Sequence, residues 1–193
     1  MIPTYIINLK ERVDRKSYIL DEIKKLPGLS YEIVDAIRDE TKTCFASHIK
    51  CIQQAKDNRL PYVLILEDDA MFTDDCITIF NSVFAEIQSQ QWDMLYLGAN
   101  LNSSAQSITP LLLKLSGAYT THAYMVHERF YDTILNLKLD VEIDVCYSKL
   151  MAEHNIYMCD PMIAYQLPSH SDLQDGFRDY NSAMYNNYLR FKP

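Results

Sequence analysis

The segment that most constrains the fold is a run of five apolar residues, Tyr62-Val-Leu-Ile-Leu66, which follows Pro61. The run does not alternate between apolar and polar side chains, so neither face of a strand built from it can lie in water. Strands of this kind are typical of parallel sheets that carry helices on both faces. The run therefore predicts a central strand of an α/β domain.

Strand-like and helix-like segments alternate along the rest of the chain. Such alternation builds βαβ units, which close onto a mainly parallel central sheet flanked by helices. Because the 193 residues contain no linker or repeat, we expect one domain over 1–193, with an irregular C-terminal tail at 173–193. The predicted strands are 3–8, 31–37, 62–66, 93–98 and 119–127, with short edge elements at 157–166, and the predicted helices are 11–26, 43–58, 77–87 and 142–153.

Charge and cysteine content exclude several classes of protein. The 18 basic and 26 acidic residues give a net charge of −8, and no basic run offers the phosphate contacts of a nucleic-acid binder. No stretch approaches the ~20 apolar residues of a membrane-spanning helix, although a peripheral membrane contact stays open. The five cysteines form no C-x-x-C pair, so we expect reduced thiols and a cytoplasmic protein, whether or not it sits at the membrane face.

Three acids, Glu67, Asp68 and Asp69, directly follow the central run. Ligands of open α/β sheets bind at the carboxyl ends of the strands, where these acids stand. Two carboxylates ~4 Å apart repel by about 4 kcal/mol, so a proton, a basic neighbour or a bound cation must offset the charge. No Lys or Arg lies between Tyr62 and Asp75, which favours Mg²⁺ or Mn²⁺. The alternative is a helix cap with the other acids solvated.

The segment after the first predicted strand carries four cations, including Arg12 and Arg15. Residues three apart share one face of a helix, so this pair could hold phosphate oxygens. The alternative interpretation is an ordinary solvated first turn. Together with a cation on the acids, the segment favours a diphosphate ligand.

Taken in order, the motifs of this chain resemble glycosyltransferase family 25, which contains lipooligosaccharide and collagen galactosyltransferases. The likeness spans nearly the whole chain, and its pieces are specific only in combination. They are Tyr5-Ile-Ile-Asn-Leu-Lys with Arg12 and Asp14-Arg15, Val34-Asp35-Ala36-Ile37, Cys44-x-x-Ser47-His48, Val63-Leu-Ile-Leu-Glu67-Asp68-Asp69-Ala70, Trp92-Asp93-Met-Leu-Tyr-Leu-Gly98, Ala123-Tyr-Met-Val126, Ile143-Asp144, and Pro161 through Gln166 to Ser171-Asp172-Leu173.

The resemblance implies a GT-A-like fold and transfer of a hexose, galactose or glucose, from a UDP-sugar with inversion and with Mn²⁺ or Mg²⁺. It implies a glycan, glycolipid or hydroxylated protein as the acceptor. Asp69 would be the first metal ligand, and Asp68 would touch the ribose or the metal. The residues implied in donor binding are Asn8, Arg12, Arg15, Ser47, His48, Glu67 and Asp68.

Inverting transfer needs a base that takes the proton of the acceptor hydroxyl. Asp144 is the first candidate, by analogy with acids at this place in other GT-A enzymes, and a helix N-cap is its alternative role. Asp172, with His170 beside it, is the second candidate base. Asp172 and His170 could instead complete the metal shell, because a hard cation takes about six ligands.

Two other functions stay open. The first is a nucleotide-sugar or glycan binding module with reduced catalysis, since only six residues separate Ile37 from Cys44, fewer than is usual in the family. The second is a metal-dependent phosphohydrolase. That class needs a nucleophilic Asp after the first strand, where this chain has Asn8.

Overall fold

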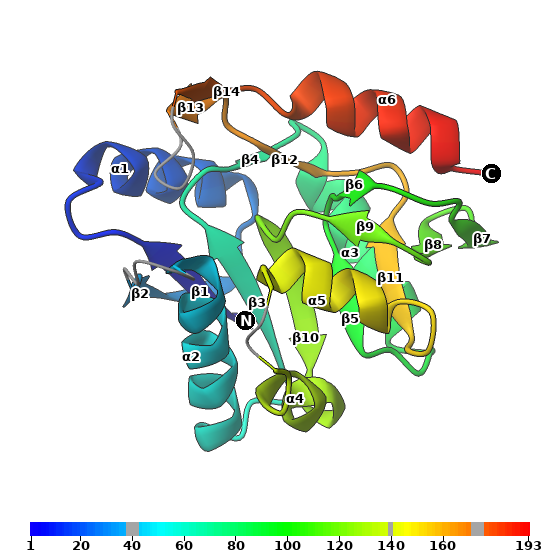
Figure 1. The fold of residues 1–193 in the computed structure, drawn as a ribbon, viewed down its shortest axis with the longest axis horizontal. Helices are drawn as coiled ribbons and strands as arrows, with labels where there is room; N and C mark the ends of the chain where they lie inside the picture. Colours follow the sequence, from blue (N-terminus) through cyan, green and yellow to red (C-terminus); the bar gives the residue numbers. More distant parts are fainter. Residues whose placement is uncertain (38–42, 139–140, 171–175) are drawn as a thin grey trace.

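A computed structural model of the chain describes residues 1–37, 43–138, 141–170 and 176–193 (Figure 1). Within these ranges one central sheet contains the strands β1 (Ile2–Asn8), β2 (Leu29–Asp35), β3 (Tyr62–Glu67), β5 (Met94–Tyr96), β7 (Gln106–Thr109), β8 (Leu112–Lys114), β10 (Ala123–His127) and β11 (Ile156–Cys159). Their order is β2-β1-β3-β10-β5-β11-β8-β7. All run in one direction except β8 and β10. The predicted single α/β domain with a mainly parallel sheet is confirmed.

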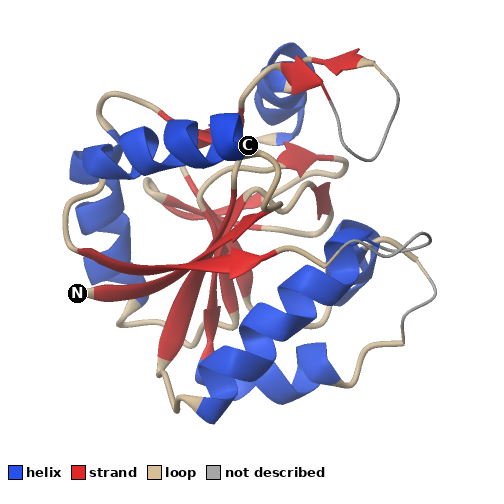
Figure 2. Ribbon diagram, turned by 90° about the vertical axis from the view of Figure 1, so that its left-hand side faces the viewer, coloured by secondary structure: helices blue, strands red, loops and turns tan. Residues whose placement is uncertain are grey.

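Helices cover both faces of this sheet (Figure 2). The helices of the described ranges are α1 (Val13–Glu22), η1 (Ile23–Lys25), α2 (Thr43–Asp57), α3 (Cys76–Ile87), α4 (Glu128–Leu135), α5 (Ile143–Leu150) and α6 (Asn181–Phe191). None of these helices combines the length and the apolar character that crossing a membrane requires.

The central strand β3 shows why its sequence is apolar throughout. Val63 and Ile65 belong to a core cluster that they share with residues of α2, α4 and α5. Leu64 and Leu66 point to the other face and join a cluster with residues of α1 and α3. All four side chains are fully buried, as expected for a strand covered on both sides.

Of two sequence predictions at the C-terminal end, one is wrong in part and the other is wrong. The sequence predicts short edge elements over 157–166, but β11 pairs with β5 on one side and with β8 on the other, whereas among the described residues β12 (Ala164–Gln166) pairs with β4 (Ala70–Phe72) alone. Residues 173–193 are not irregular throughout, because 181–191 form α6. Met184 and Tyr188, one turn apart on that helix, are buried against the domain, and this burial stabilises a helix with little apolar character elsewhere.

Short two-stranded ribbons stand beside the main sheet: β4 (Ala70–Phe72) with β12 (Ala164–Gln166), β13 (Ser169–His170) with β14 (Phe177–Arg178), and β6 (Asn100–Leu101) with β9 (Ala118–Tyr119). The first of them begins directly after Asp69, whose carbonyl accepts a hydrogen bond from the backbone N–H of Leu167 at 2.7 Å. This ribbon therefore joins the acid run to the C-terminal part of the chain.

Candidate active site

The site forms where β1 and β3 end side by side. Ile7 and Glu67 are partners in the parallel ladder, so Asn8 and Asp68 leave the sheet next to each other. Asn8 is 2% exposed, and its Nδ2 donates a hydrogen bond of 2.7 Å to Asp68 Oδ2. The same amide group donates to the carbonyl of Arg12 at 3.2 Å. Asn8 thus fixes both the acid run and the entry into α1.

Arg15 is the basic neighbour that the sequence around the acids lacks. Its Nη1 lies 3.1 Å from Asp68 Oδ1 and 3.4 Å from Asp69 Oδ2. Its Nη2 donates to Ser169 Oγ at 2.6 Å and to the carbonyl of His170 at 3.0 Å. One guanidinium group therefore ties together α1, the acids and β13.

One cation does not balance this cluster of carboxylates. Burial and the charges of Glu67 and Asp68 raise the pKa of Asp69 to about 8, although Arg15 opposes the shift. Burial also raises the pKa of Asp68 against the hydrogen bonds from Asn8 and Arg15. In addition, Asp69 Oδ1 is buried with no hydrogen-bond partner among the described residues. The site therefore favours a further positive charge near Asp69.

Glu67 turns away from this pair toward α2 and the segment before β10. Its Oε1 accepts a hydrogen bond from Thr121 Oγ1 at 2.7 Å and lies 3.3 Å from His48 Nε2. Burial opposes ionisation of Glu67, but the hydrogen bonds of His48 and Thr121 and the charge of His48 outweigh it and lower the pKa. The contacts with His48 and Thr121 therefore favour the ionised form of Glu67.

A buried chain of polar side chains holds His48. Its Nδ1 lies 2.7 Å from the Tyr124 hydroxyl, which lies 3.4 Å from the Tyr147 hydroxyl. When the imidazole is neutral, Nε2–H donates to Glu67, so Nδ1 accepts from Tyr124. The chain fixes one ring orientation and directs it at the carboxylate.

Two of the predicted donor-binding residues have partners outside this cluster. Arg12 donates two hydrogen bonds of 3.0 Å to the carboxylate of Asp14. Ser47 Oγ accepts a hydrogen bond of 2.9 Å from the backbone N–H of Ile37, which ties the end of the β2 segment to α2. The geometry therefore gives Ser47 a role in holding Ile37 against α2.

The candidate base Asp144 lies in the first turn of α5. Its Oδ1 accepts from the backbone N–H of Val145 at 2.8 Å, and its Oδ2 accepts from that of Thr120 at 3.3 Å. Thr120 has a positive φ of 75°, so the bond holds an unusual turn just before β10. Asp144 is not the N-cap, a position that Glu142 occupies. The other candidate base, Asp172, lies outside the described residues.

The predicted metal set of Asp68, Asp69 and His170 does not gather into a ligand group. Among the described residues, no three His, Cys, Asp or Glu side chains lie close enough to hold an ion. The His170 ring packs against Phe177, with ring centroids 5.8 Å apart. A divalent cation still fits the unpartnered Asp69 Oδ1, because Mg²⁺ is usually bound by one or two carboxylates together with water and substrate phosphates.

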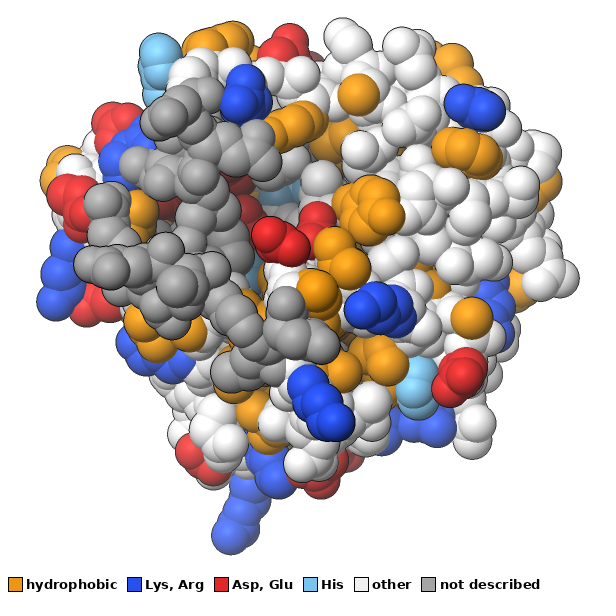
Figure 3. All heavy atoms as spheres, in the orientation of Figure 1, with side chains coloured by type: hydrophobic (Ala, Val, Ile, Leu, Met, Phe, Trp, Pro, Cys, Tyr) orange, Lys and Arg blue, Asp and Glu red, His pale blue; other side chains and the backbone are white. Residues whose placement is uncertain are grey.

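The molecular surface is hollowed near the middle of the face in Figure 3, and acidic side chains are visible in the hollow. His122, which is fully buried, adjoins Glu67, whose backbone N–H donates a hydrogen bond of 2.9 Å to the His122 carbonyl. Burial lowers its pKa, so the imidazole stays uncharged next to Glu67. An uncharged His122 therefore adds no positive charge beside the acids.

Family comparison decides the class of protein. The description "Glycosyltransferase family 25 (LPS biosynthesis protein)" matches residues 1–43 and 39–141, which is well over half of the chain. The chain belongs to glycosyltransferase family 25. It is therefore a glycosyltransferase, as the sequence motifs predicted. No curated protein matches it.

Solved structures support the fold of this family 25 protein. Drosophila β1,4-galactosyltransferase 7, a mutant in complex with manganese, UDP-Gal and xylobiose, is 10% identical with a TM-score of 0.52, over 94% of this chain and 78% of that one. S. aureus TarS with UDP-GlcNAc is 11% identical with a TM-score of 0.52, over 89% of this chain and 60% of that one. A197 from STIV is 11% identical with a TM-score of 0.52, over 86% of both chains. At these identities the likeness shows a shared GT-A-like fold.

Sequence reasoning missed several partners of the site, which are Thr121, Tyr124, Tyr147 and Ser169. Each lies far along the chain from the residue it contacts. The position of Thr121 in the sequence could have identified it. Thr121 lies just before β10, which runs antiparallel to β3, and the start of an antiparallel strand lies beside the carboxyl end of its neighbour.

Proposed function

We propose that this protein transfers a hexose, galactose or glucose, from a UDP-sugar to an acceptor hydroxyl with inversion, and that the reaction needs Mn²⁺ or Mg²⁺. The observation that carries the proposal is the pair Asp68–Asp69, held by Asn8 and Arg15 at the carboxyl end of β3 with Asp69 Oδ1 left without a partner. The GT-A-like neighbours with UDP-sugars support it, one of which also contains manganese.

Asp69 is the first residue we expect to hold the cation, with Asp68 as second ligand or ribose contact. When bound, the cation neutralises charge on the departing diphosphate. Asn8 keeps Asp68 in place, and Arg15 lies within reach of both acids, so it can also face a phosphate oxygen. Arg12, at the start of the same helix, is the second cation for the nucleotide.

The acceptor proton needs a carboxylate base, for which we propose Asp144. Each Asp144 oxygen accepts one backbone hydrogen bond, which keeps a lone pair for the acceptor hydroxyl and fixes the carboxylate in one orientation. Asp172 is the alternative base. Turnover of Asp144→Asn against Asp172→Asn separates the two, because loss of the base lowers kcat by about 10²–10⁴.

The acceptor is proposed to be a glycan, a glycolipid or a hydroxylated protein. The lipopolysaccharide role in the family description favours a glycolipid, and with it a place of action at the cytoplasmic face of a membrane. A hydroxylated protein would be accepted only if the acceptor site tolerates a peptide.

UDP release from UDP-galactose and UDP-glucose, measured with and without Mn²⁺, tests the activity. We expect metal-dependent release that Asp69→Ala abolishes. The exposed Asp75, which caps no backbone group of α3 with its side chain, gives the matched control Asp75→Ala with unchanged release. No UDP release and no calorimetric binding of UDP with metal would end the proposal.

A non-catalytic binding module of the same fold is the second candidate. It is favoured by Asp68, because both of its oxygens accept hydrogen bonds from side chains of the protein, Asn8 and Arg15. This candidate expects UDP binding that survives Asp144→Asn and no turnover in either form. Measurable turnover of the wild-type protein excludes it.

A further inference from the structure

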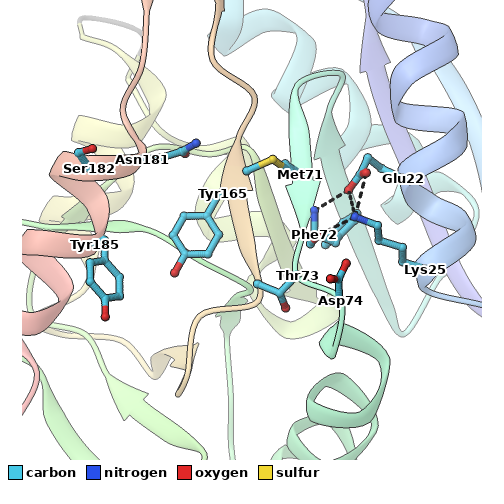
Figure 4. A pocket seen from close by; sticks show the side chains of 10 residues that line it. All are labelled: Glu22, Lys25, Met71, Phe72, Thr73, Asp74, Tyr165, Asn181, Ser182 and Tyr185. Atoms are coloured by element: carbon cyan, nitrogen blue, oxygen red, sulfur yellow. Dashed lines mark hydrogen bonds and ion pairs between the residues drawn. The ribbon is translucent and has the colours of Figure 1, made fainter.

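A groove of about 620 Å³ lies beyond the acid site, between the end of α1, the β4–β12 ribbon and α6 (Figure 4). Its volume falls within the range of small-molecule sites. It is lined from one side by Glu22 and Lys25 and from the other by the first residues of α6. None of the residues assigned above to donor or metal binding lines it.

Two tyrosines give the groove its character. Tyr165 comes from β12 and Tyr185 from α6, and their side chains flank one part of the space (Figure 4). Tyr185 is 50% exposed although it is aromatic. A tyrosine offers an apolar face and a polar end, which matches a sugar ring with C–H groups on its faces and hydroxyls at its rim.

The groove also contains polar atoms that lack partners. Thr73 Oγ1 and Asn181 Oδ1 are both buried, and neither has a hydrogen-bond partner among the described residues. Buried polar atoms normally find a partner in protein or water. Both residues line the groove, so a ligand rich in hydroxyl groups would supply the missing hydrogen bonds.

Two segments of the chain, α1 and β4, lead from the acid site to the groove. On α1, Arg15 contacts Asp69, and seven residues later Glu22 Oε2 accepts a hydrogen bond of 2.7 Å from the backbone N–H of Phe72. Seven helical residues and three strand residues both span about 10 Å. The groove therefore lies about 10 Å from the acids, a separation that a short oligosaccharide can span.

We propose that this groove binds the acceptor glycan at sugar units behind the one that reacts. The inference rests on the proposed transferase function. The occupant is a short oligosaccharide, because aromatic faces and unpartnered oxygen atoms occur together in a groove about 10 Å from the acids. Tyr165 and Tyr185 hold sugar faces, and Thr73 and Asn181 hold hydroxyl groups.

Saturation-transfer NMR on the full-length protein with UDP and Mn²⁺ tests the groove. The probes are lactose, cellobiose, maltose and core oligosaccharide released from lipopolysaccharide. We expect at least one to bind, and Tyr185→Ala to weaken that binding about tenfold or more. The matched control is Tyr31→Ala, since Tyr31 is 51% exposed and lies outside the groove.

A second variant separates binding from folding. Thr73→Val keeps the shape of the side chain and removes an oxygen that has no protein partner, so the protein stays folded while glycan binding weakens about fivefold. In each variant, calorimetry should give unchanged binding of UDP with Mn²⁺.

The inference is overturned if a wild-type protein that binds UDP binds none of the four probes, or if Tyr185→Ala and Tyr31→Ala bind the glycan equally well. Failure of the proposed function looks different. In that case the wild-type protein binds no UDP with Mn²⁺. If glycan binding is still weakened by Tyr185→Ala, the groove is a lectin-like site instead.

Discussion

Arg15 Nη1 lies 3.1 Å from Asp68 Oδ1, and both side chains are nearly buried, with 11% and 9% exposed. Removal of one partner from a buried ion pair leaves an uncompensated charge. We expect Arg15→Met to lower the free energy of unfolding by about 3 kcal/mol. Urea unfolding at neutral pH measures this change.

Arg12→Met is the matched control for Arg15. It removes a guanidinium group three residues earlier whose ion pair is with the largely exposed Asp14, so the loss of stability should be smaller. If both variants lowered the free energy of unfolding equally, the contact of Arg15 with Asp68 would stabilise the protein no more than the contact of Arg12 with Asp14 does.

Asp69 makes stability depend on pH. Its pKa is raised from near 4 to about 8, so between these values the folded protein binds a proton that the unfolded chain has lost. Stability contributed by this group is therefore complete below about pH 4 and falls as the pH rises toward 8, by at most about 1.4 kcal/mol per pH unit.

We expect Asp69→Asn to remove this pH dependence. The variant should be more stable than the wild type near pH 8, and it should lose Mn²⁺-dependent binding of UDP. Urea midpoints across the pH range and calorimetry measure the two effects. A wild-type midpoint that stays constant from about pH 5 to pH 8 would contradict the assignment of the raised pKa to Asp69.

Tyr124 supports the proposed donor site through His48. Tyr124→Phe removes the hydroxyl that lies 2.7 Å from His48 Nδ1, so the ring loses its fixed orientation toward Glu67. We expect a stability loss of about 1–2 kcal/mol and a fall in kcat of about tenfold or more.

Tyr131→Phe is the control for Tyr124. The Tyr131 hydroxyl donates to the carbonyl of Leu60 at 3.1 Å and takes no part in the site. The stability loss should be similar and kcat unchanged. If both variants lose kcat to the same degree, the effect of Tyr124 is one of general stability.

Gly98 allows the close approach of two segments that frame the site. A Cβ at this position would lie 1.9 Å from the carbonyl oxygen of Ala164, which no backbone tolerates without moving. We expect Gly98→Ala to cost about 3 kcal/mol or more and to disturb β12. Thermal unfolding checks this, and Gly117→Ala, which would meet only the flexible side chains of Asn102 and Ser103, should cost less.

The sequence predicted those helices and strands whose own residues show a clear hydrophobic pattern. β1, β3 and α2 follow from apolar runs and helical spacing, and the structure places them within two residues of the expected ends. β11 could not be distinguished from an edge strand, because four buried residues identify a strand but not its neighbours. Helix α6 depends on Met184 and Tyr188 packing against the domain, which no local rule contains.

The residues of the site also fall into some that the sequence predicted and others that it could not. The family resemblance assigned Asn8 to the donor site, and the strand-end rule placed the acids at the carboxyl edge of the sheet. Neither could predict that Arg15 turns its guanidinium to acids 53 and 54 residues away, or that Ser169 completes that contact. Side-chain direction on α1 is decided by how the helix packs.

The β4–β12 ribbon connects the proposed acceptor groove to the acids, and this connection limits where acceptor preference can change. β12 touches the groove through Tyr165 and, at its end, leads to the backbone N–H of Leu167 that holds the carbonyl of Asp69. Helix α6 also lines the groove, but no contact of its own reaches the acids among the described residues. Natural variation that retunes which sugar chain is accepted should therefore accumulate on α6, where it leaves the chemistry of the donor undisturbed.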